Sequence, residues 1–133
     1  MQSRRSYQTL IGIGSLLAAL AVAAGAFGAH MLKQILDPPM LAVFETAARY
    51  QMYHALGMIA AGLAGQVFGC LRVLRAGWCF AAGILLFCGS LYGVSLLGIR
   101  WLGALTPIGG VAFILGWSLL GWSVWREKMP GQD

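Results

Sequence analysis

The sequence predicts an all-α fold, an integral membrane bundle of four helices. Of its 133 residues 59% are hydrophobic, and only 10% are charged, against about 25% in a typical soluble domain. The apolar residues gather in four segments of about 20 residues each, a length that crosses a hydrocarbon core of about 30 Å as a helix. Backbone polar groups inside lipid must bond within their own segment, which favours helices. We therefore expect a single transmembrane domain over residues 1–133.

The first two predicted helices cover residues 7–29 and 40–69. The second has a polar beginning and becomes strongly apolar from residue 50 onward. The sequence DPPM at residues 37–40 precedes it and supplies a cap and a first turn, because Asp caps helix N-termini and Pro is accepted in the first turn.

The third and fourth predicted helices cover residues 76–98 and 102–125. Thr106 is a suitable N-cap and Pro107 suits a first helical turn, which offers a later start for the fourth helix, with residues 100–105 as a structured connection. The other possibility is that Pro107 kinks the longer helix that begins at residue 102.

The distribution of lysine and arginine predicts how the chain is oriented. The net charge is +5, but the basic residues are scattered at segment ends and form no basic face, so nucleic-acid binding is not expected. Cytoplasmic loops carry an excess of Lys and Arg, which places both termini in the cytoplasm. The richer side carries Arg4, Arg5, Arg72, Arg75, Arg126 and Lys128, and the other side carries Lys33, Arg49 and Arg100.

Small residues form stripes along the predicted helices. Such stripes let helix backbones approach closely, which is how helices associate where lipid removes the hydrophobic driving force. Membrane helices are also rich in Gly for no special reason, but the repeated spacing favours packing, within this chain or with another. The predicted packing residues are Gly14, Ala18, Ala21, Gly25 and Gly28, then Gly57, Ala61 and Gly65, then Gly89 and Gly93.

The stretch FETAARYQMYHALGM, residues 44–58, places polar side chains at the beginning of the second apolar segment. Glu45 and Arg49 are four residues apart, in the order that favours an ion pair on a helix, and Tyr53 continues their face. We expect this pair to hold the beginning of the helix at the outer face of the membrane, rather than to relay protons. Arg100, before the fourth helix, is a further polar candidate.

Tyr50 and His54 lie on the opposite face, in line with Gly57, at the top of the predicted packing seam. An ionisable residue at membrane depth is a candidate functional residue by default. His54 with His30 fits a bis-imidazole haem in a bundle core. The alternative, favoured by the lack of a fuller ligand set, is that both histidines lie within a turn or two of the interface and bond to helix ends.

Other chemistry is not indicated by the sequence. Cys70, Cys79 and Cys88 form no CxxC pattern, and an odd count inside apolar segments argues against a disulfide framework, so they are interpreted as small apolar residues. Ser90 and Ser95 stand without an ionisable neighbour on their helix, which gives no nucleophile and base pair. The sequence predicts no metal site and assigns no cofactor, and we expect that the protein is not an enzyme.

Four motifs follow one another along the chain: GAFGAH at residues 25–30, FETAARYQMYHALG at 44–57, GSLY at 89–92 and RWLGALTPIGG at 100–110. Together they resemble the YgdD/YwdK family of small multi-pass membrane proteins of unknown function, found in bacteria with relatives in animal mitochondria. The resemblance covers nearly the whole chain and implies a four-helix protein of the bacterial inner membrane. It implies no activity, substrate or catalytic residue.

Three functions remain open from the sequence. The first is a non-enzymatic bundle that sits in the lipid bilayer and binds other membrane proteins, or itself, as an assembly or stabilising subunit. The second is an oligomeric transport or channel subunit, which requires that His54 or Arg49 lines a water-accessible cavity. The third is a redox accessory that binds haem or a quinone. We rank them in that order.

Overall fold

The computed structural model describes residues 2–126, and the elements in that part of the chain are all helical. Residue 1 and residues 127–133, including Lys128, lie outside the described residues. The first half of the chain forms two long helices, α1 (Gln2–His30) and α2 (Pro38–Phe68), with a short 3-10 turn, η1 (Leu32–Gln34), between them.

The second half of the chain also forms two long helices. One is continuous and consists of α3 (Leu71–Gly83), a π-helical turn η2 (Ile84–Cys88) and α4 (Gly89–Leu97). The 3-10 segment η3 (Arg100–Leu105) then leads into α5 (Thr106–Arg126).

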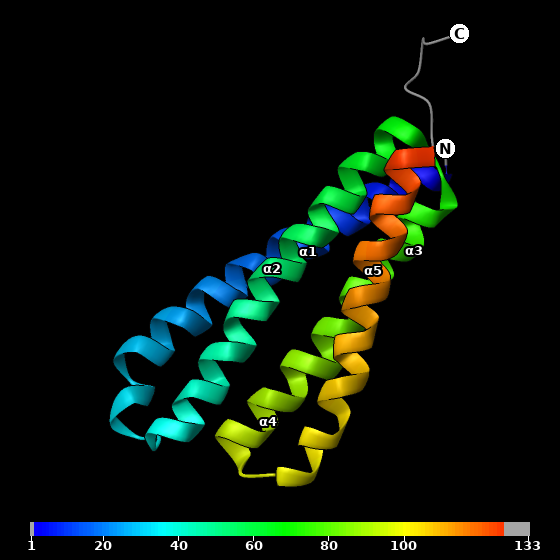
Figure 1. The fold of residues 1–133 in the computed structure, drawn as a ribbon. Coiled ribbons are helices and arrows are strands. Elements are labelled where there is room, and N and C mark those ends of the chain that lie inside the picture. Colours follow the sequence, from blue (N-terminus) through cyan, green and yellow to red (C-terminus); the bar gives the residue numbers. More distant parts are fainter. Residues whose placement is uncertain (1, 127–133) are drawn as a thin grey trace, which may run out of the picture.

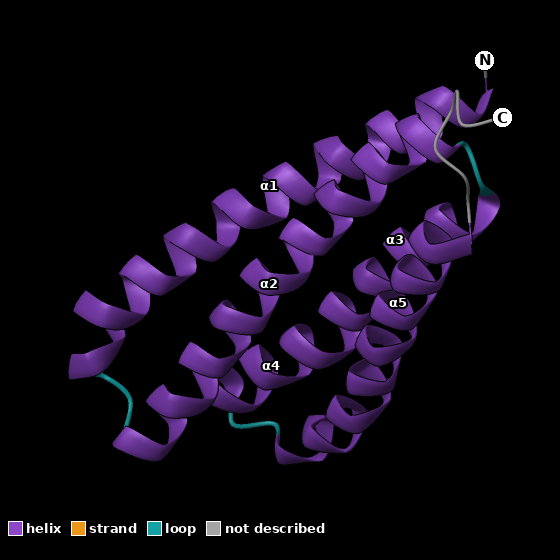
Figure 2. Ribbon diagram, turned by 45° about the horizontal axis from the view of Figure 1, so that its top comes forward, coloured by secondary structure: helices purple, strands orange, loops and turns teal. Residues whose placement is uncertain are grey.

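The long helices form two antiparallel hairpins, as Figures 1 and 2 show. α1 packs against α2, and the continuous helix α3–η2–α4 packs against α5. α2 also contacts α3, η2, α4 and α5, so it is the helix that joins the two hairpins. The beginning of α1, the α2–α3 turn and the end of α5 lie together at one end of the bundle, which we call the terminal end (Figure 1).

The ends of α2 follow from local sequence. The Asp37 carboxylate accepts a hydrogen bond from the backbone N–H of Met40 at 2.8 Å, which confirms the cap predicted from DPPM. The helix ends at Gly69, whose φ of 65° lies in the left-handed region that glycine adopts without strain. The third helix then begins at Leu71, earlier than the predicted residue 76.

The structure decides between the two possibilities at Pro107. α5 begins at Thr106, after η3, so Pro107 lies in the first turn of the helix and does not kink a longer one. Thr106 is not an N-cap, because its own φ and ψ of −56° and −46° are helical. Its hydroxyl instead shares a hydrogen bond of 2.8 Å with the hydroxyl of Ser90.

Three helical stretches are long and apolar enough to cross a membrane: Arg4–Gln34, Leu71–Leu97 and Arg100–Arg126. α2 is not among them, although the sequence predicted four such spans. Its 31 residues are sufficient in length, so its composition is the reason. Gln51 and His54 lower its hydropathy, yet both are buried against other helices, where a helix does not need lipid-compatible side chains.

Large side chains of one helix lie directly on glycines of another, in contacts that we call glycine seats. The ring of Phe80 on α3 lies between Gly57 of α2 and Gly116 of α5, and the ring of Phe113 on α5 lies on Gly83. A side-chain carbon at Gly57 would come within 3.1 Å of the Phe80 ring, which is closer than nine in ten such contacts in real structures. Further seats are Tyr7 on Gly65, Ile11 on Gly62, Leu10 on Gly77, Phe44 on Gly28 and Leu102 on Gly93, and at Gly109 the contact is with the backbone and Cβ of Phe87.

Most of the small residues predicted to pack do lie at helix contacts, but two do not. A side-chain carbon at Gly25 or Gly89 would meet nothing within 4 Å, so these two glycines do not pack against another helix of this chain, and contact with another chain stays a prediction. α1 packs mainly against α2, which leaves one edge of its stripe uncovered at Gly25. At Gly89 the π-helical turn adds a residue and rotates the helix face. The buried members are Gly14, Ala21, Gly28, Gly57, Ala61, Gly65 and Gly93, and Ala18 is partly buried.

The α1–α2 contact predicts that substitution by alanine affects stability differently at two neighbouring glycines. In Gly14→Ala the added carbon would lie 2.8 Å from the backbone oxygen of Ala55, so the free energy of unfolding in detergent is expected to fall by about 1–3 kcal/mol. Gly12→Ala is the matched control, because its added carbon meets nothing within 4 Å. Equal stability changes in the two variants, measured by thermal or denaturant unfolding, would contradict the contact.

Candidate functional site

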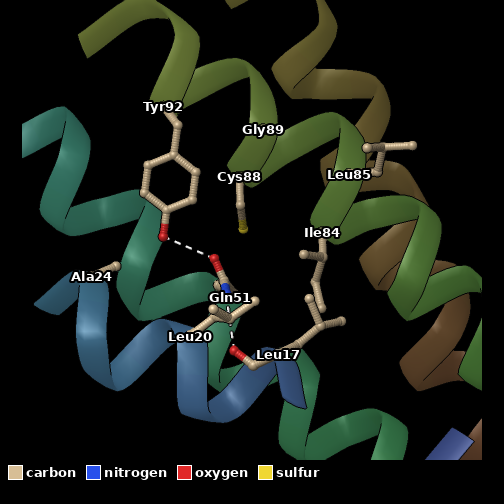
Figure 3. A pocket seen from close by; sticks show the side chains of 9 residues that line it. All are labelled: Leu17, Leu20, Ala24, Gln51, Ile84, Leu85, Cys88, Gly89 and Tyr92. Carbon is tan, nitrogen blue, oxygen red and sulfur yellow. Dashed lines mark hydrogen bonds between the residues drawn. The ribbon is translucent and has the colours of Figure 1, made fainter. Parts of the chain in front are cut away.

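Gln51 connects three helices through its side-chain amide. Its exposed fraction is only 6%, and it projects from α2 into the space between α1 and α4 (Figure 3). Nε2 donates to the backbone oxygen of Leu17 at 2.9 Å, and Oε1 accepts from the hydroxyl of Tyr92 at 2.8 Å. Burial of an amide without partners is costly, so these two bonds fix α1 and α4 on either side of α2.

An open groove of about 380 Å³ lies beside Gln51, between α1 and the third long helix. We call it the lateral groove. α1 packs closely against α2 but hardly against the third helix, and this leaves the space open. Its lining is mainly apolar, and Figure 3 shows Gln51 and Tyr92 joined to each other at its wall. It is lined by Leu17, Leu20, Ala24, Gln51, Ile84, Leu85, Cys88, Gly89 and Tyr92.

The π-helical turn η2 forms part of the wall of the lateral groove. Its residues Ile84, Leu85 and Cys88 line the groove directly. On its other side the backbone of Phe87 approaches Gly109 of α5 so closely that a side-chain carbon there would overlap it. Single π-helical turns are rare and frequently occur at functional sites, because the extra residue redirects the side chains that follow. Here the turn exposes Gly89 to the groove.

A second polar contact joins α4 to the beginning of α5. The Ser90 hydroxyl donates to the backbone oxygen of Phe87 at 2.9 Å and also bonds to the Thr106 hydroxyl. Sequence reasoning assigned no role to Ser90, Thr106 or Tyr92 as partners, although Ser90 and Tyr92 both lie in the motif GSLY. The sequence signal that could have identified Gln51 was its position as a polar residue within an apolar segment.

His54 lies in the middle of α2, roughly 24 Å along the helix axis from Pro38. Its hydrogen bond is made within α2, and not to the end of a neighbouring helix as expected from the sequence. Its exposed fraction is 5%, and Nδ1 donates to the backbone oxygen of Tyr50 at 2.7 Å. The imidazole stacks on Phe113, with ring centroids 3.3 Å apart and planes inclined by 7°.

His30 is not placed to share a ligand with His54. It is exposed at the end of α1. Gly28, just before it, lies on Phe44 of α2, and from Phe44 to His54 the helix axis extends roughly 15 Å. Two imidazoles on one haem iron must lie far closer than this, so the paired-histidine hypothesis is wrong. Among the described residues, no group of three His, Cys, Asp or Glu side chains is suited to hold a metal ion.

Glu45 and Arg49 do not form the expected ion pair. Both are exposed, and the structure gives no bond between these two described side chains. An ion pair between two exposed side chains is only slightly more stable than the same two side chains hydrated separately. The beginning of α2 therefore does not need this pair. Tyr53 and Arg100 are also exposed, at the surface of α2 and at the first residue of η3.

Tyr50 and His54 are the sequence-predicted polar residues that the structure does bring together. Their rings lie 5.9 Å apart, and the Tyr50 ring also stacks on Phe87 at 4.8 Å. Phe113, Phe80 and Trp117 complete an aromatic cluster around His54. His54 therefore packs between aromatic rings, where α2 meets α3 and α5, and does not line the lateral groove.

Known proteins match the chain over most of its length. A family model described as a protein of unknown function, DUF423, matches residues 24–110. The UPF0382 membrane protein of Staphylococcus epidermidis is 46% identical over 113 residues, which cover 85% of this chain and 92% of that protein. The UPF0382 membrane protein YwdK of Bacillus subtilis is 47% identical over 114 residues, covering 85% and 93%. No solved structure matches the chain significantly. The matches confirm the resemblance carried by the four motifs.

Because His54 is stacked on Phe113, we predict that its flat ring contributes more to stability than the hydrogen bonds of its nitrogens. His54→Phe is expected to keep the free energy of unfolding within about 1 kcal/mol, because a phenyl ring stacks on Phe113 equally well. His54→Ala is expected to lose about 2–4 kcal/mol through the cavity it leaves. His30→Ala serves as the exposed control, with a change within about 0.5 kcal/mol. Equal damage from His54→Phe and His54→Ala would show that the imidazole itself is needed.

Proposed function

Since the chain belongs to the DUF423 family, whose similar members are named UPF0382 membrane proteins, it is a multi-pass membrane protein, and we propose that it acts as a non-enzymatic assembly or stabilising subunit. The observation that carries the proposal is the lateral groove. The groove opens to the outside of the bundle between α1 and the helix α3–η2–α4. In a membrane, lipid or another helix would cover this opening. We propose that it receives a transmembrane helix of another membrane protein.

The proposed setting is an integral four-helix bundle in the bacterial inner membrane. α2 is the fourth span in this proposal, since it is as long as α1 and runs antiparallel to it. The bacterial relatives are named membrane proteins, which supports a location in a bacterial membrane. The terminal end carries the described arginines of the richer side, which supports cytoplasmic termini by the positive-inside rule. These arginines are Arg4, Arg5, Arg72, Arg75 and Arg126.

The residues that line the lateral groove are better suited to contact with a helix than to catalysis. Leu20 and Leu85 stand at its sides with exposed fractions of 52% and 74%, and Ala24 and Gly89 leave room between them. Small residues next to large apolar ones allow close approach of a second helix in lipid. The polar side chains of the groove, Gln51 and Tyr92, are bonded to each other. The groove therefore offers shape and apolar surface.

The polar residues of the interior support a structural role for the chain. Gln51 joins α1, α2 and α4, Ser90 joins α4 to α5, and His54 packs between aromatic rings. Each of these side chains is used in contacts between helices of the same chain. We therefore propose that partner selection depends on the outer surface of the bundle, with the groove as its main contact.

Site-specific photo-cross-linking in intact cells tests the proposal. Leu20 and Val22 are both exposed on α1, at 52% and 62%, but of the two only Leu20 lines the lateral groove. A photoreactive amino acid at position 20 is expected to give a discrete protein adduct, and the same amino acid at position 22 is expected to react with lipid. Mass spectrometry of the adduct identifies the partner, and an adduct of twice the chain's mass would identify a second copy.

Two results would contradict the proposal. If position 20 reacts with lipid alone, the lateral groove is a lipid-covered surface. If positions 20 and 22 give the same protein adducts, the contact is not specific to the groove.

A further inference from the structure

The π-helical turn η2 (Ile84–Cys88) lies in a helix that is otherwise α-helical from Leu71 to Leu97. The backbone N–H of Gly89 donates to the backbone oxygen of Ile84, five residues earlier. An α-helix closes its turns over four residues, so this turn holds one extra residue and is wider than its neighbours. The turn contains no proline that would cause it, so its origin must be sought in the contacts around it.

The contacts made before and after η2 differ in register by one residue. Phe80 of α3 is seated between glycines of α2 and α5, and Tyr92 of α4 bonds to Gln51. In an unbroken α-helix of this sequence that kept the position of Phe80, Leu91 would lie roughly where Tyr92 lies now, because the helix would lose the extra residue of the turn. The turn therefore brings both sets of contacts into place at once.

A chain shorter by one residue could make the same contacts without a π-helical turn. Leu86 is partly buried in η2 and does not line the lateral groove. Its removal would leave α3 and α4 in their present registers, joined by an ordinary α-helical turn. These contacts therefore do not require the extra residue, and what it adds is width.

The extra width of η2 changes the wall of the lateral groove. On the α5 side the backbone of Phe87 already lies against Gly109, so the turn cannot expand in that direction. On the groove side Leu85 is 74% exposed, compared with 52% for Leu20 on the α1 wall (Figure 3). Gly89 lies beside Leu85, so the wall has a raised leucine next to a depression.

Gly89 is a glycine seat without an occupant from this chain. A side-chain carbon at Gly89 would meet no described atom within 4 Å. Gly83, earlier on the same long helix, instead receives the ring of Phe113 from α5. Helices of this bundle approach one another where a large side chain of one lies on a glycine of the other, and the same packing joins separate chains in lipid.

We propose that η2 makes Gly89 an open seat, bounded by the raised Leu85, which receives a large apolar side chain of the partner's transmembrane helix. This inference rests on the proposed function and specifies which part of the lateral groove recognises the partner.

Filling the seat tests the inference, with the photo-cross-link from position 20 as the readout. Gly89→Leu occupies the seat with a side chain of this chain, so the yield of the protein adduct is expected to fall at least about fivefold. Its midpoint of thermal unfolding is expected to stay within about 3 °C of the wild type, since the space is open. Gly12→Leu is the matched control, because Gly12 is equally open but does not line the groove.

Deletion of Leu86 tests the role of the turn itself. It removes the extra residue and keeps every side chain that lines the groove, so the adduct is expected to be lost while thermal unfolding stays unchanged. Leu86→Ala keeps the turn and is expected to keep the adduct. Deletion of Trp78 from α3 shifts the register of core contacts, and is expected to lower the unfolding midpoint by at least about 10 °C.

Three results would overturn the inference. The adduct could persist in Gly89→Leu or in the Leu86 deletion, or Gly12→Leu could reduce it equally. The Leu86 deletion could destabilise the chain as much as the Trp78 deletion, which would make the turn a requirement of the fold. If the wild type gives no protein adduct at position 20, the proposed function fails and this inference fails with it, whereas an adduct that Gly89→Leu leaves unchanged contradicts this inference alone.

Discussion

Close contact between a large side chain and a glycine is the interaction on which the rest of this structure depends. Lipid gives helices no hydrophobic reason to associate, so their association relies on dense packing and on bonds between them. Phe80 shows the effect most directly, because its ring lies between Gly57 and Gly116 and so holds α2, α3 and α5 together. At Gly109 the approach is closer still, with the backbone of Phe87 against the glycine. The π-helical turn and the exposed Gly89 lie next to that contact.

The central position of α2 explains the distribution of polar residues. The other long helices contact it, so its Gln51 and His54 lie inside protein and bond or stack there. The same arrangement leaves α1 attached to the bundle almost through α2 alone, and the lateral groove is the space that results. At the terminal end, the tight α3–α5 contact instead produces a groove next to arginines and tryptophans. The two grooves therefore differ in chemistry because they border different helix pairs.

Much of the fold was predictable from the sequence, because helix length, the Asp37 cap and the Pro107 start are local properties. Most glycine contacts were also predictable from spacing, since helical periodicity places them on one face. The errors arose where tertiary contacts decide the outcome. A helical wheel cannot anticipate the π-helical turn that moves Gly89, or the rings of Phe80 and Phe113 from two other helices that enclose His54. The partners of Gln51, on α1 and α4, become evident only once three helices are arranged in space.

The central claim is that α2 crosses the membrane although it is not among the described helical stretches that are apolar enough to span it by composition alone. Cysteine labelling tests it most directly, in a variant whose Cys70, Cys79 and Cys88 are replaced by alanine. Ile35→Cys before α2 and Leu71→Cys after it are both at exposed positions. An impermeant maleimide added to intact cells, or to spheroplasts where an outer membrane is present, is predicted to label position 35, and position 71 only after the inner membrane is permeabilised. Labelling of both positions from the same side would contradict the account.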